Sequence, residues 1–239
     1  MTPQEIDHAI SAARASTARL LALIAGWQTE DMRRPSTLPD WTVGHLLTHL
    51  ARNAEGNCRM LDGAARDEIV DQYPHGREGR AADIEAGSDR PGPEIVADVT
   101  ETAAALDERW SMMPREAWAR PVRMFSGEQP AWGALVSRNR EIEVHAVDLD
   151  CGYTPADWPA AFVAAELDHV VRGLEGRLAA GTALRAASTD TGWVAEVGAG
   201  PASVTVTGPA AYLLAWLIGR AVPEGTLLAP AGLPPLGAW

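Results

Sequence analysis

The stretch "REIEVHAVDLD", residues 140–150, contains one histidine and four carboxylates. On a helix, Glu141 and His145 are four residues apart and therefore lie on the same face. Glu143 is about 200° around the helix from Glu141, so it faces the opposite side. Asp148 lies one turn beyond His145, within reach of its imidazole, whereas Asp150 lies farther from that line. The stretch predicts one inward pair, Glu141 and His145, with Asp148 as a candidate partner of the imidazole.

Two histidines, His45 and His49, have the same four-residue spacing as Glu141 and His145. They lie in "DWTVGHLLTHLARNAEGNCRMLDG", residues 40–63. There, His49 lies at the edge of the apolar face, and His45 lies about 40° away from it. Two histidines and one glutamate around an open fourth position are a common set of catalytic zinc ligands, and helix bundles often assemble such sites. By spacing alone, a salt-bridged surface pair and a hydrogen-bonded core histidine are the more frequent outcomes.

Four amphipathic segments can position these groups. The first begins with a capping box, in which Thr2 is the N-cap, Pro3 the first helical residue and Glu5 the reciprocal acceptor. Apolar residues then recur at helical spacing in each segment. The expected helices cover residues 2–25, 42–62, 92–113 and 130–150. They predict a four-helix bundle with at least one long connection, residues 63–92, whose length itself suggests a functional role.

The sequence changes character after residue 152. Residues 153–159 are rich in turn formers, and a helix is expected at 160–179. Three short runs, "ALRAAST", "GWVAEVG" and "ASVTVTG", favour strands of a small antiparallel sheet, and residues 209–220 favour a last helix. We therefore expect two domains, an all-helical one at 1–152 and a smaller α+β domain at 153–239, which gives an α+β protein overall.

Composition excludes several classes of function. The net charge is −12, which argues against a general nucleic-acid or anionic-membrane surface. No apolar run is long enough to span a membrane, and no basic-then-apolar leader is present, so a cytoplasmic protein is expected. Cys58 and Cys151 are too few for a disulfide framework and are expected to be reduced packing residues. All basic residues are arginine, which removes lysine Schiff-base chemistry. A monomer is the default expectation.

Two segments, "LPDWTVGHLLTHLARNA" (38–54) and "SRNREIEVHAVDLD" (137–150), resemble the signature segments of the mycothiol-dependent maleylpyruvate isomerase family. The N-terminal domain of that family is a DinB-like, metal-binding four-helix bundle, and the C-terminal domain resembles the sterol-carrier-like fold. By position, the resemblance implies that His49, Glu141 and His145 are the metal ligands.

The resemblance also implies arginines around the site. "GRAADI" places one at Arg80, inside the long connection, and "YLLAWLIGR" places another at Arg220. The alternatives are an exposed loop arginine for Arg80 and, for Arg220, a cation that complements a helix dipole. Asp148 is a candidate to orient a ligand imidazole, whereas the role of His45 stays open.

The implied reaction is the isomerisation of maleylpyruvate to fumarylpyruvate. A divalent metal, most commonly zinc in such sites, would lower the pKa of mycothiol, the thiol cosubstrate. The thiolate would add to the cis double bond, the resulting single bond would rotate, and elimination would return the trans isomer. Arg80 and Arg220 would bind the carboxylates of the dianionic substrate.

Two alternatives remain on the sequence alone. One is a mycothiol S-transferase that conjugates electrophiles or opens epoxides at the same metal site. The other is a non-catalytic binding protein, which the intact set of His49, Glu141 and His145 disfavours. Iron, nickel and cobalt also suit two histidines and a carboxylate, so the sequence leaves the identity of the metal open.

Overall fold

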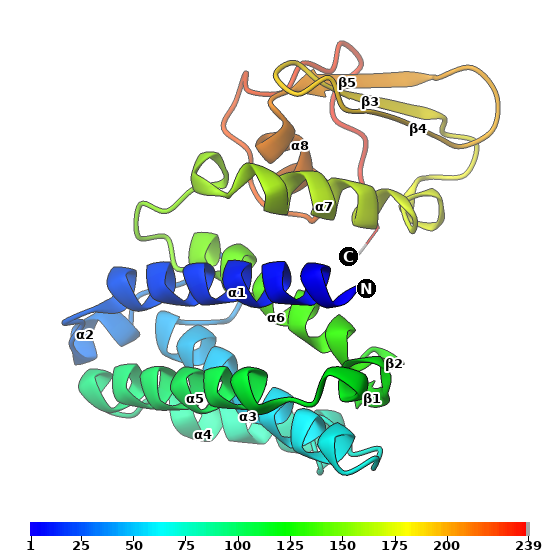
Figure 1. The fold of residues 1–239 in the computed structure, drawn as a ribbon. Helices are drawn as coiled ribbons and strands as arrows, with labels where there is room; N and C mark the ends of the chain where they lie inside the picture. Colours follow the sequence, from blue (N-terminus) through cyan, green and yellow to red (C-terminus); the bar gives the residue numbers. More distant parts are fainter. Residues whose placement is uncertain (238–239) are drawn as a thin grey trace. The chain divides into compact units, whose positions relative to one another are not determined.

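The computed structural model describes residues 1–237, and the chain divides into two compact units. The first unit contains residues 1–153, and the second begins at Thr154 (Figure 1). Both units contain helices and paired strands, so the predicted α+β class is confirmed. No helix in the described part of the chain is long and apolar enough to cross a membrane.

Four long helices make up most of the first unit. They are α1 (Pro3–Ile24), α3 (Val43–Ala65), α5 (Gly92–Met112) and α6 (Ala131–Asp148). Helix α3 packs against α5 and α6, and α1 packs against α6 and α5. These helices agree with the four amphipathic segments expected from the sequence, to within a few residues at each end.

Capping residues fix where two of these helices begin. The Thr2 hydroxyl accepts a hydrogen bond from the Glu5 amide, and the Glu5 carboxylate accepts one from the Thr2 amide at 2.6 Å. In α3, the hydroxyl of Thr42 accepts a hydrogen bond from the backbone amide of His45, whose imidazole Nδ1 lies 2.8 Å from that hydroxyl. The second cap sets the start of the helix that carries His49.

The interior of the helices consists of two apolar clusters with buried polar residues between them. One cluster includes Ile6, Ile10, Trp110 and Leu135, and the other includes Leu20, Leu46, Ile95 and Ile142. Along α1, α3 and α6, buried polar side chains separate the two clusters; they are Ser16, Asn53 and Arg138. We call these three residues the polar layer. Buried polar groups need partners, so this layer constrains how the helices pair.

The long connection between α3 and α5 contains a helix of 13 residues, α4 (Gly76–Ser88). Glycines let α4 lie close to α3: a Cβ at Gly44 would be 2.2 Å from the Ser88 carbonyl oxygen, and one at Gly87 would be 2.5 Å from the Thr48 side chain. Sequence periodicity did not reveal α2 (Thr29–Met32), the 3₁₀ helix η1 (Arg115–Ala119) or the hairpin of β1 (Pro121–Met124) and β2 (Gly127–Pro130).

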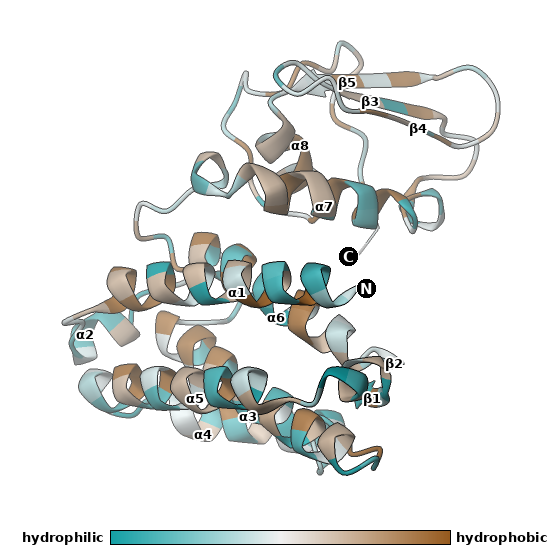
Figure 2. Ribbon diagram, viewed as in Figure 1, coloured by the Kyte–Doolittle hydropathy of each residue, from teal (hydrophilic) through white to brown (hydrophobic). Residues whose placement is uncertain are grey.

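The second unit combines helices with one small sheet. It contains α7 (Ala160–Val171), α8 (Ala210–Leu217) and the 3₁₀ helices η2 (Pro155–Asp157) and η3 (Glu175–Arg177), with strands β3 (Leu184–Ser188), β4 (Val194–Val197) and β5 (Val204–Gly208). Helix α8, largely white to brown in Figure 2, is buried against β3, β5 and α7. The expectation of an antiparallel sheet holds for β3 and β4 but is wrong for β3 and β5. The order is β4-β3-β5, and β3 pairs with β5 in parallel.

Candidate metal centre

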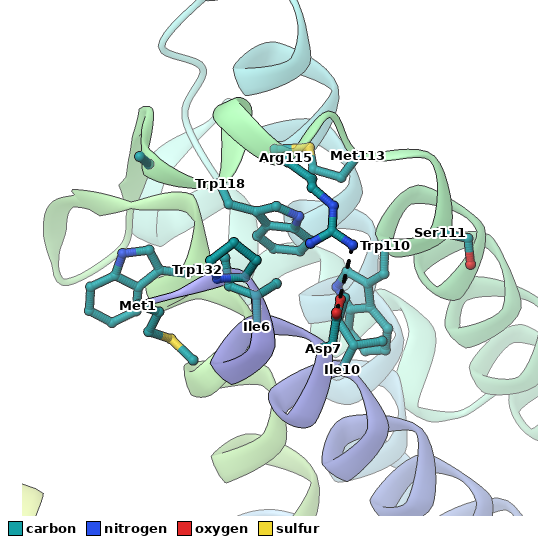
Figure 3. A pocket seen from close by; sticks show the side chains of 12 residues that line it. Met1, Ile6, Asp7, Ile10, Trp110, Ser111, Met113, Arg115, Trp118 and Trp132 are labelled. Atoms are coloured by element: carbon teal, nitrogen blue, oxygen red, sulfur yellow. Dashed lines mark ion pairs between the residues drawn. The ribbon is translucent and has the colours of Figure 1, made fainter.

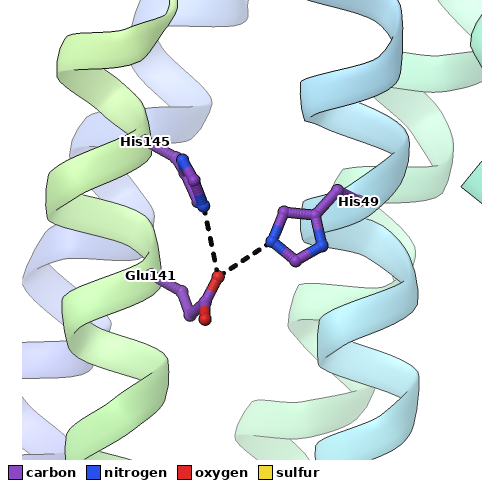
Figure 4. A group of neighbouring side chains, drawn as sticks. All are labelled: His49, Glu141 and His145. Atoms are coloured by element: carbon purple, nitrogen blue, oxygen red, sulfur yellow. Dashed lines mark hydrogen bonds and ion pairs between the residues drawn. The ribbon is translucent and has the colours of Figure 1, made fainter. Parts of the chain in front are cut away.

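Three of the residues singled out from the sequence meet between α3 and α6. Nε2 of His49 lies 2.9 Å from Oε2 of Glu141, and Nε2 of His145 lies 3.3 Å from the same oxygen. One ligand atom from each residue lies within 4.8 Å of the other two. Figure 4 shows both imidazoles directed at the carboxylate, His49 from one helix and His145 from the other. Two imidazole nitrogens and one carboxylate oxygen in this arrangement suit a divalent metal.

A hydrogen bond behind His145 orients its ring. Nδ1 of His145 lies 2.8 Å from Oδ2 of Asp148, a fully buried carboxylate. The other oxygen of Asp148 accepts a hydrogen bond from the Thr37 hydroxyl at 2.8 Å. A carboxylate can only accept, so Nδ1 carries a proton, which leaves Nε2, directed at Glu141, as the nitrogen that could bind a metal. Asp148 therefore has the position that a partner of a ligand imidazole requires.

The site binds few protons at neutral pH. Burial is the main reason that the pKa of His49 falls to about 4, so its imidazole is neutral. Burial alone would raise the pKa of Glu141, but hydrogen bonds with His145 and His49 hold that pKa well below its usual range. Burial opposes the charge on His145 too, yet its hydrogen bonds with Asp148 and Glu141 raise its pKa. His145 therefore carries the proton that competes most with a metal.

His45 does not belong to this group. Its Nδ1 lies at the N-cap of α3 beside Thr42, and its Nε2 lies 3.2 Å from the carboxylate of Glu85. His45 therefore takes part in the cap of α3 and in a polar contact with Glu85 on α4.

Arg80 extends from α4 to the same site. One terminal nitrogen of its guanidinium lies 3.0 Å from Nδ1 of His49. It also lies over the rings of Tyr73 and Phe125, 5.6 and 5.9 Å from their centroids. In the described part of the chain, no carboxylate lies within ion-pair distance of Arg80. Its positive charge is therefore available at the edge of the site.

Arg220 lies in the second unit, just after α8. Its backbone amide donates to the Ala215 carbonyl at 2.8 Å, and its guanidinium donates to the Ile218 carbonyl at 3.0 Å. These contacts hold the arginine at the helix end. Its expected role beside the metal ligands stays a prediction.

Other residues at the centre had no signal in the sequence. The Trp41 ring packs edge-on against His49, with ring centroids 5.6 Å apart. Tyr73 is mostly buried, and burial raises its pKa, although hydrogen bonding with Arg80 and Asn53 opposes that rise. Arg138 lies one turn before Glu141 on α6 and is 1% exposed. A single aromatic residue or arginine carries no spacing pattern, so periodicity could not have found these three.

A separate cavity lies where α1 begins and α5 ends. It has a volume of about 270 Å³ and is lined by the indoles of Trp110, Trp118 and Trp132 (Figure 3). An ion pair between Arg115 and Asp7, 3.7 Å apart, lies at this cavity. The lining residues include no histidine or cysteine. The chemistry-bearing groups are gathered at the centre between α3 and α6 instead.

Fold and site together define a helical domain with a candidate metal centre, joined to a smaller α+β unit. Residues 13–150 match the model of the mycothiol maleylpyruvate isomerase N-terminal domain family, and the chain belongs to that family. The expected family and the expectation of an enzyme are thereby confirmed.

Two solved structures share the fold along their whole length. A crystal structure of the mycothiol-dependent maleylpyruvate isomerase superposes with a TM-score of 0.90 at 24% sequence identity, with all of both chains covered. The structure of a histidine-to-alanine mutant of that isomerase gives a TM-score of 0.90 at 23% identity, also with full coverage of both chains. No curated protein matches the sequence significantly.

Proposed function

We propose that this chain is a metal- and mycothiol-dependent cis-trans isomerase that converts maleylpyruvate to fumarylpyruvate. The observation that carries the proposal is the convergence of His49, Glu141 and His145 from two helices onto one point. Membership of the isomerase family and a shared fold with the solved isomerase support the same choice of reaction.

The ligand set would hold a divalent metal, for which zinc is our first choice. A metal held there would lower the pKa of a bound thiol, so that the thiolate is available at neutral pH. His49 and His145 would supply neutral nitrogens, and Glu141 an ionised oxygen. Asp148 keeps the proton of His145 on Nδ1, away from the metal.

Arginines would bind the substrate, which is a dianion. The chain carries a net charge of −12, so an anionic substrate needs a local positive charge. Arg80 supplies one charge beside His49 and is free of a carboxylate partner in the described residues. We propose Arg220 for the second carboxylate. Arginine suits this role because its fork of donors matches a carboxylate.

In the proposed reaction, a carbon–sulfur bond to mycothiol forms and the same bond later breaks. The thiol sulfur bonds to one carbon of the double bond, and the adjacent carbon takes the negative charge, which the neighbouring carbonyl group delocalises. The remaining single bond rotates, and the carbon–sulfur bond then breaks to give the trans alkene and the thiolate. Arg80 would hold a carboxylate throughout, so that only the far half of the substrate turns.

A paired assay tests this function. Purified protein with mycothiol is given maleylpyruvate in one reaction and monobromobimane, a generic electrophile, in the other. We expect isomerisation of maleylpyruvate. It is monitored by adding a fumarylpyruvate hydrolase, which consumes the product, and by recording the resulting loss of ultraviolet absorption. Turnover of the bimane without any isomerisation would overturn the proposal in favour of a mycothiol S-transferase.

Metal analysis tests the site separately. Wild-type protein should contain about one zinc per chain, the number for a single three-ligand site. His49→Ala should lose both metal and activity. His45→Ala, one turn away on the same helix, should retain the metal because His45 contacts Thr42 and Glu85 instead. Purified wild-type protein that contains no metal, together with a His49→Ala variant that is as active as the wild type, would rule out a metalloenzyme.

A further inference from the structure

Among the described residues, Arg138 is the largest fully buried side chain, and it is a member of the polar layer. It precedes Glu141 by three residues and His145 by seven on α6, so it shares their helix face. Its guanidinium donates hydrogen bonds to the Leu50 carbonyl at 2.8 Å and to Oδ1 of Asn53 at 2.9 Å, both on α3. Arg138 therefore lies between the two ligand-bearing helices, about one turn from the metal ligands.

The charge of Arg138 has no carboxylate partner within ion-pair distance in the described residues. Its Nε has no hydrogen-bond acceptor either. Burial lowers the pKa of this guanidinium to about 10, which leaves it charged at neutral pH. The charge of Glu141, one turn along α6, favours the charged guanidinium from a distance, but no carboxylate of the described residues contacts it. A buried charge without a contacting counter-ion lowers the stability of a fold unless something compensates it.

The hydrogen bonds of Arg138 do not explain why it is there. The Leu50 carbonyl lies inside α3, where it already accepts a helical hydrogen bond. Oδ1 of Asn53 also accepts from Nδ2 of Asn57 at 3.2 Å. Removing the guanidinium would therefore leave neither acceptor without a donor. Nor does a positive charge favour a divalent cation nearby, because like charges repel.

One kind of occupant does benefit from this charge, and that is an anion. We propose that Arg138 is a specificity-determining residue, whose fixed positive charge behind the metal ligands makes the centre prefer anionic ligands over neutral ones. The inference rests on the proposed function, because it assumes that the centre binds a metal and an anionic substrate. Arg138 acts through the low-dielectric interior, where charges are less screened than in water, and it needs no contact with the ligand.

The test compares two small probes that differ in charge. Maleate is a cis dicarboxylate without the reactive ketone, and maleamide is its neutral diamide. Binding of each to zinc-loaded protein is measured by titration calorimetry, for wild type and for Arg138→Met, which keeps the length of the side chain without the charge. Arg138→Lys restores a charge without the guanidinium that donates both hydrogen bonds to α3. Arg138→Gln replaces Arg138→Met if that variant does not fold.

Wild type should bind maleate more tightly than maleamide. In Arg138→Met, maleate affinity should fall about tenfold, the scale of one charge acting across a protein interior, and maleamide affinity should not change. Arg138→Lys should recover most of the preference. Zinc affinity should stay equal or increase, and the melting temperature of the metal-free protein should not fall.

Arg120→Met is the matched control. It also removes one positive charge and donors to α3 carbonyls, those of Ala64 and Ala65 at the far end of that helix. It should leave the maleate preference intact.

Two outcomes would overturn the inference. The first is an Arg138→Met protein that keeps the preference for maleate. The second is one that loses zinc affinity and melting temperature together, which would make Arg138 a structural bridge between α3 and α6. A wild-type protein that binds no zinc would instead contradict the proposed function.

Discussion

At the scale of single residues, the buried carboxylate of Asp148 decides which nitrogen of His145 faces the centre. It accepts from Nδ1 at 2.8 Å, and its second oxygen accepts from Thr37. In Asp148→Asn, the amide group would donate toward Nδ1, which favours the proton on Nε2 and blocks metal binding. We expect zinc affinity to fall about 10- to 100-fold, as measured by competition with a chromophoric chelator.

Asp150→Asn is the control for that substitution. Asp150 is exposed and adopts a positive φ of 49°, a conformation that asparagine tolerates. The Asp150→Asn protein should bind zinc with the same affinity as the wild type. Equal zinc affinity of the Asp148→Asn and wild-type proteins would show that the carboxylate does not orient the ligand.

The protonation of His145 predicts how zinc affinity depends on pH. The pKa of His145 is raised, so this imidazole must release its proton before Nε2 can bind a metal. His49, with a pKa of about 4, and Glu141, with a lowered pKa, are already deprotonated above pH 5. Zinc affinity should therefore fall as the pH falls below the pKa of His145, by about tenfold per pH unit.

Calorimetry in buffers of different ionisation enthalpy counts the protons directly. Release of about one proton per zinc near pH 6 is the expected result for a single titrating imidazole. Release of two would mean that His49 is also protonated in the metal-free protein, contrary to its buried, neutral state.

At the scale of elements, the close approach of α4 to α3 brings Arg80 to His49. Gly44 permits it, because a Cβ there would meet the Ser88 carbonyl oxygen at 2.2 Å. Gly44→Ala should therefore lower the free energy of unfolding by about 1–3 kcal/mol, the usual range for overpacking, as measured by urea denaturation.

Gly173→Ala, in the second unit, is the comparison for this substitution. A Cβ at Gly173 would meet no atom within 4 Å, so the free energy of unfolding of the Gly173→Ala protein should be close to that of the wild type. The steric argument fails if Gly44→Ala is as stable as the wild type.

At the scale of the whole molecule, all three candidate metal ligands come from the first unit, whereas Arg220 belongs to the second. A substitution in the second unit should therefore be able to change substrate binding without changing metal binding. Arg220→Met should leave zinc content unchanged and lower kcat/KM for maleylpyruvate, by about 10- to 100-fold if one charge-assisted hydrogen-bond pair is lost. Zinc content is measured by atomic absorption and activity by the coupled assay.

Arg172→Met, an arginine that contacts His169 in the second unit, provides the control. Its kcat/KM should equal that of the wild type. An Arg220→Met enzyme with wild-type kcat/KM would remove Arg220 from the proposed site.

The sequence by itself determined the long helices and the ligand pair within one of them. Apolar spacing and the Thr2 capping box are local properties, and the i, i+4 spacing of Glu141 and His145 on α6 fixes their common face. The facing helix offered His49 as the third ligand, and the family resemblance turned this weak spacing pattern into an expected metal site. The resemblance also placed Arg80, in the connection that contains α4.

Only the tertiary structure decided how these elements meet. The parallel pairing of β3 with β5 depends on a long-range contact that alternation does not encode, and the antiparallel expectation was therefore wrong. His45 and His49 lie one helical turn apart on α3. In the folded chain, His45 contacts the N-cap residue Thr42, whereas His49 contacts Glu141. The buried charge of Arg138 is visible only once α3 and α6 are packed, because burial is a property of the folded chain and not of any segment.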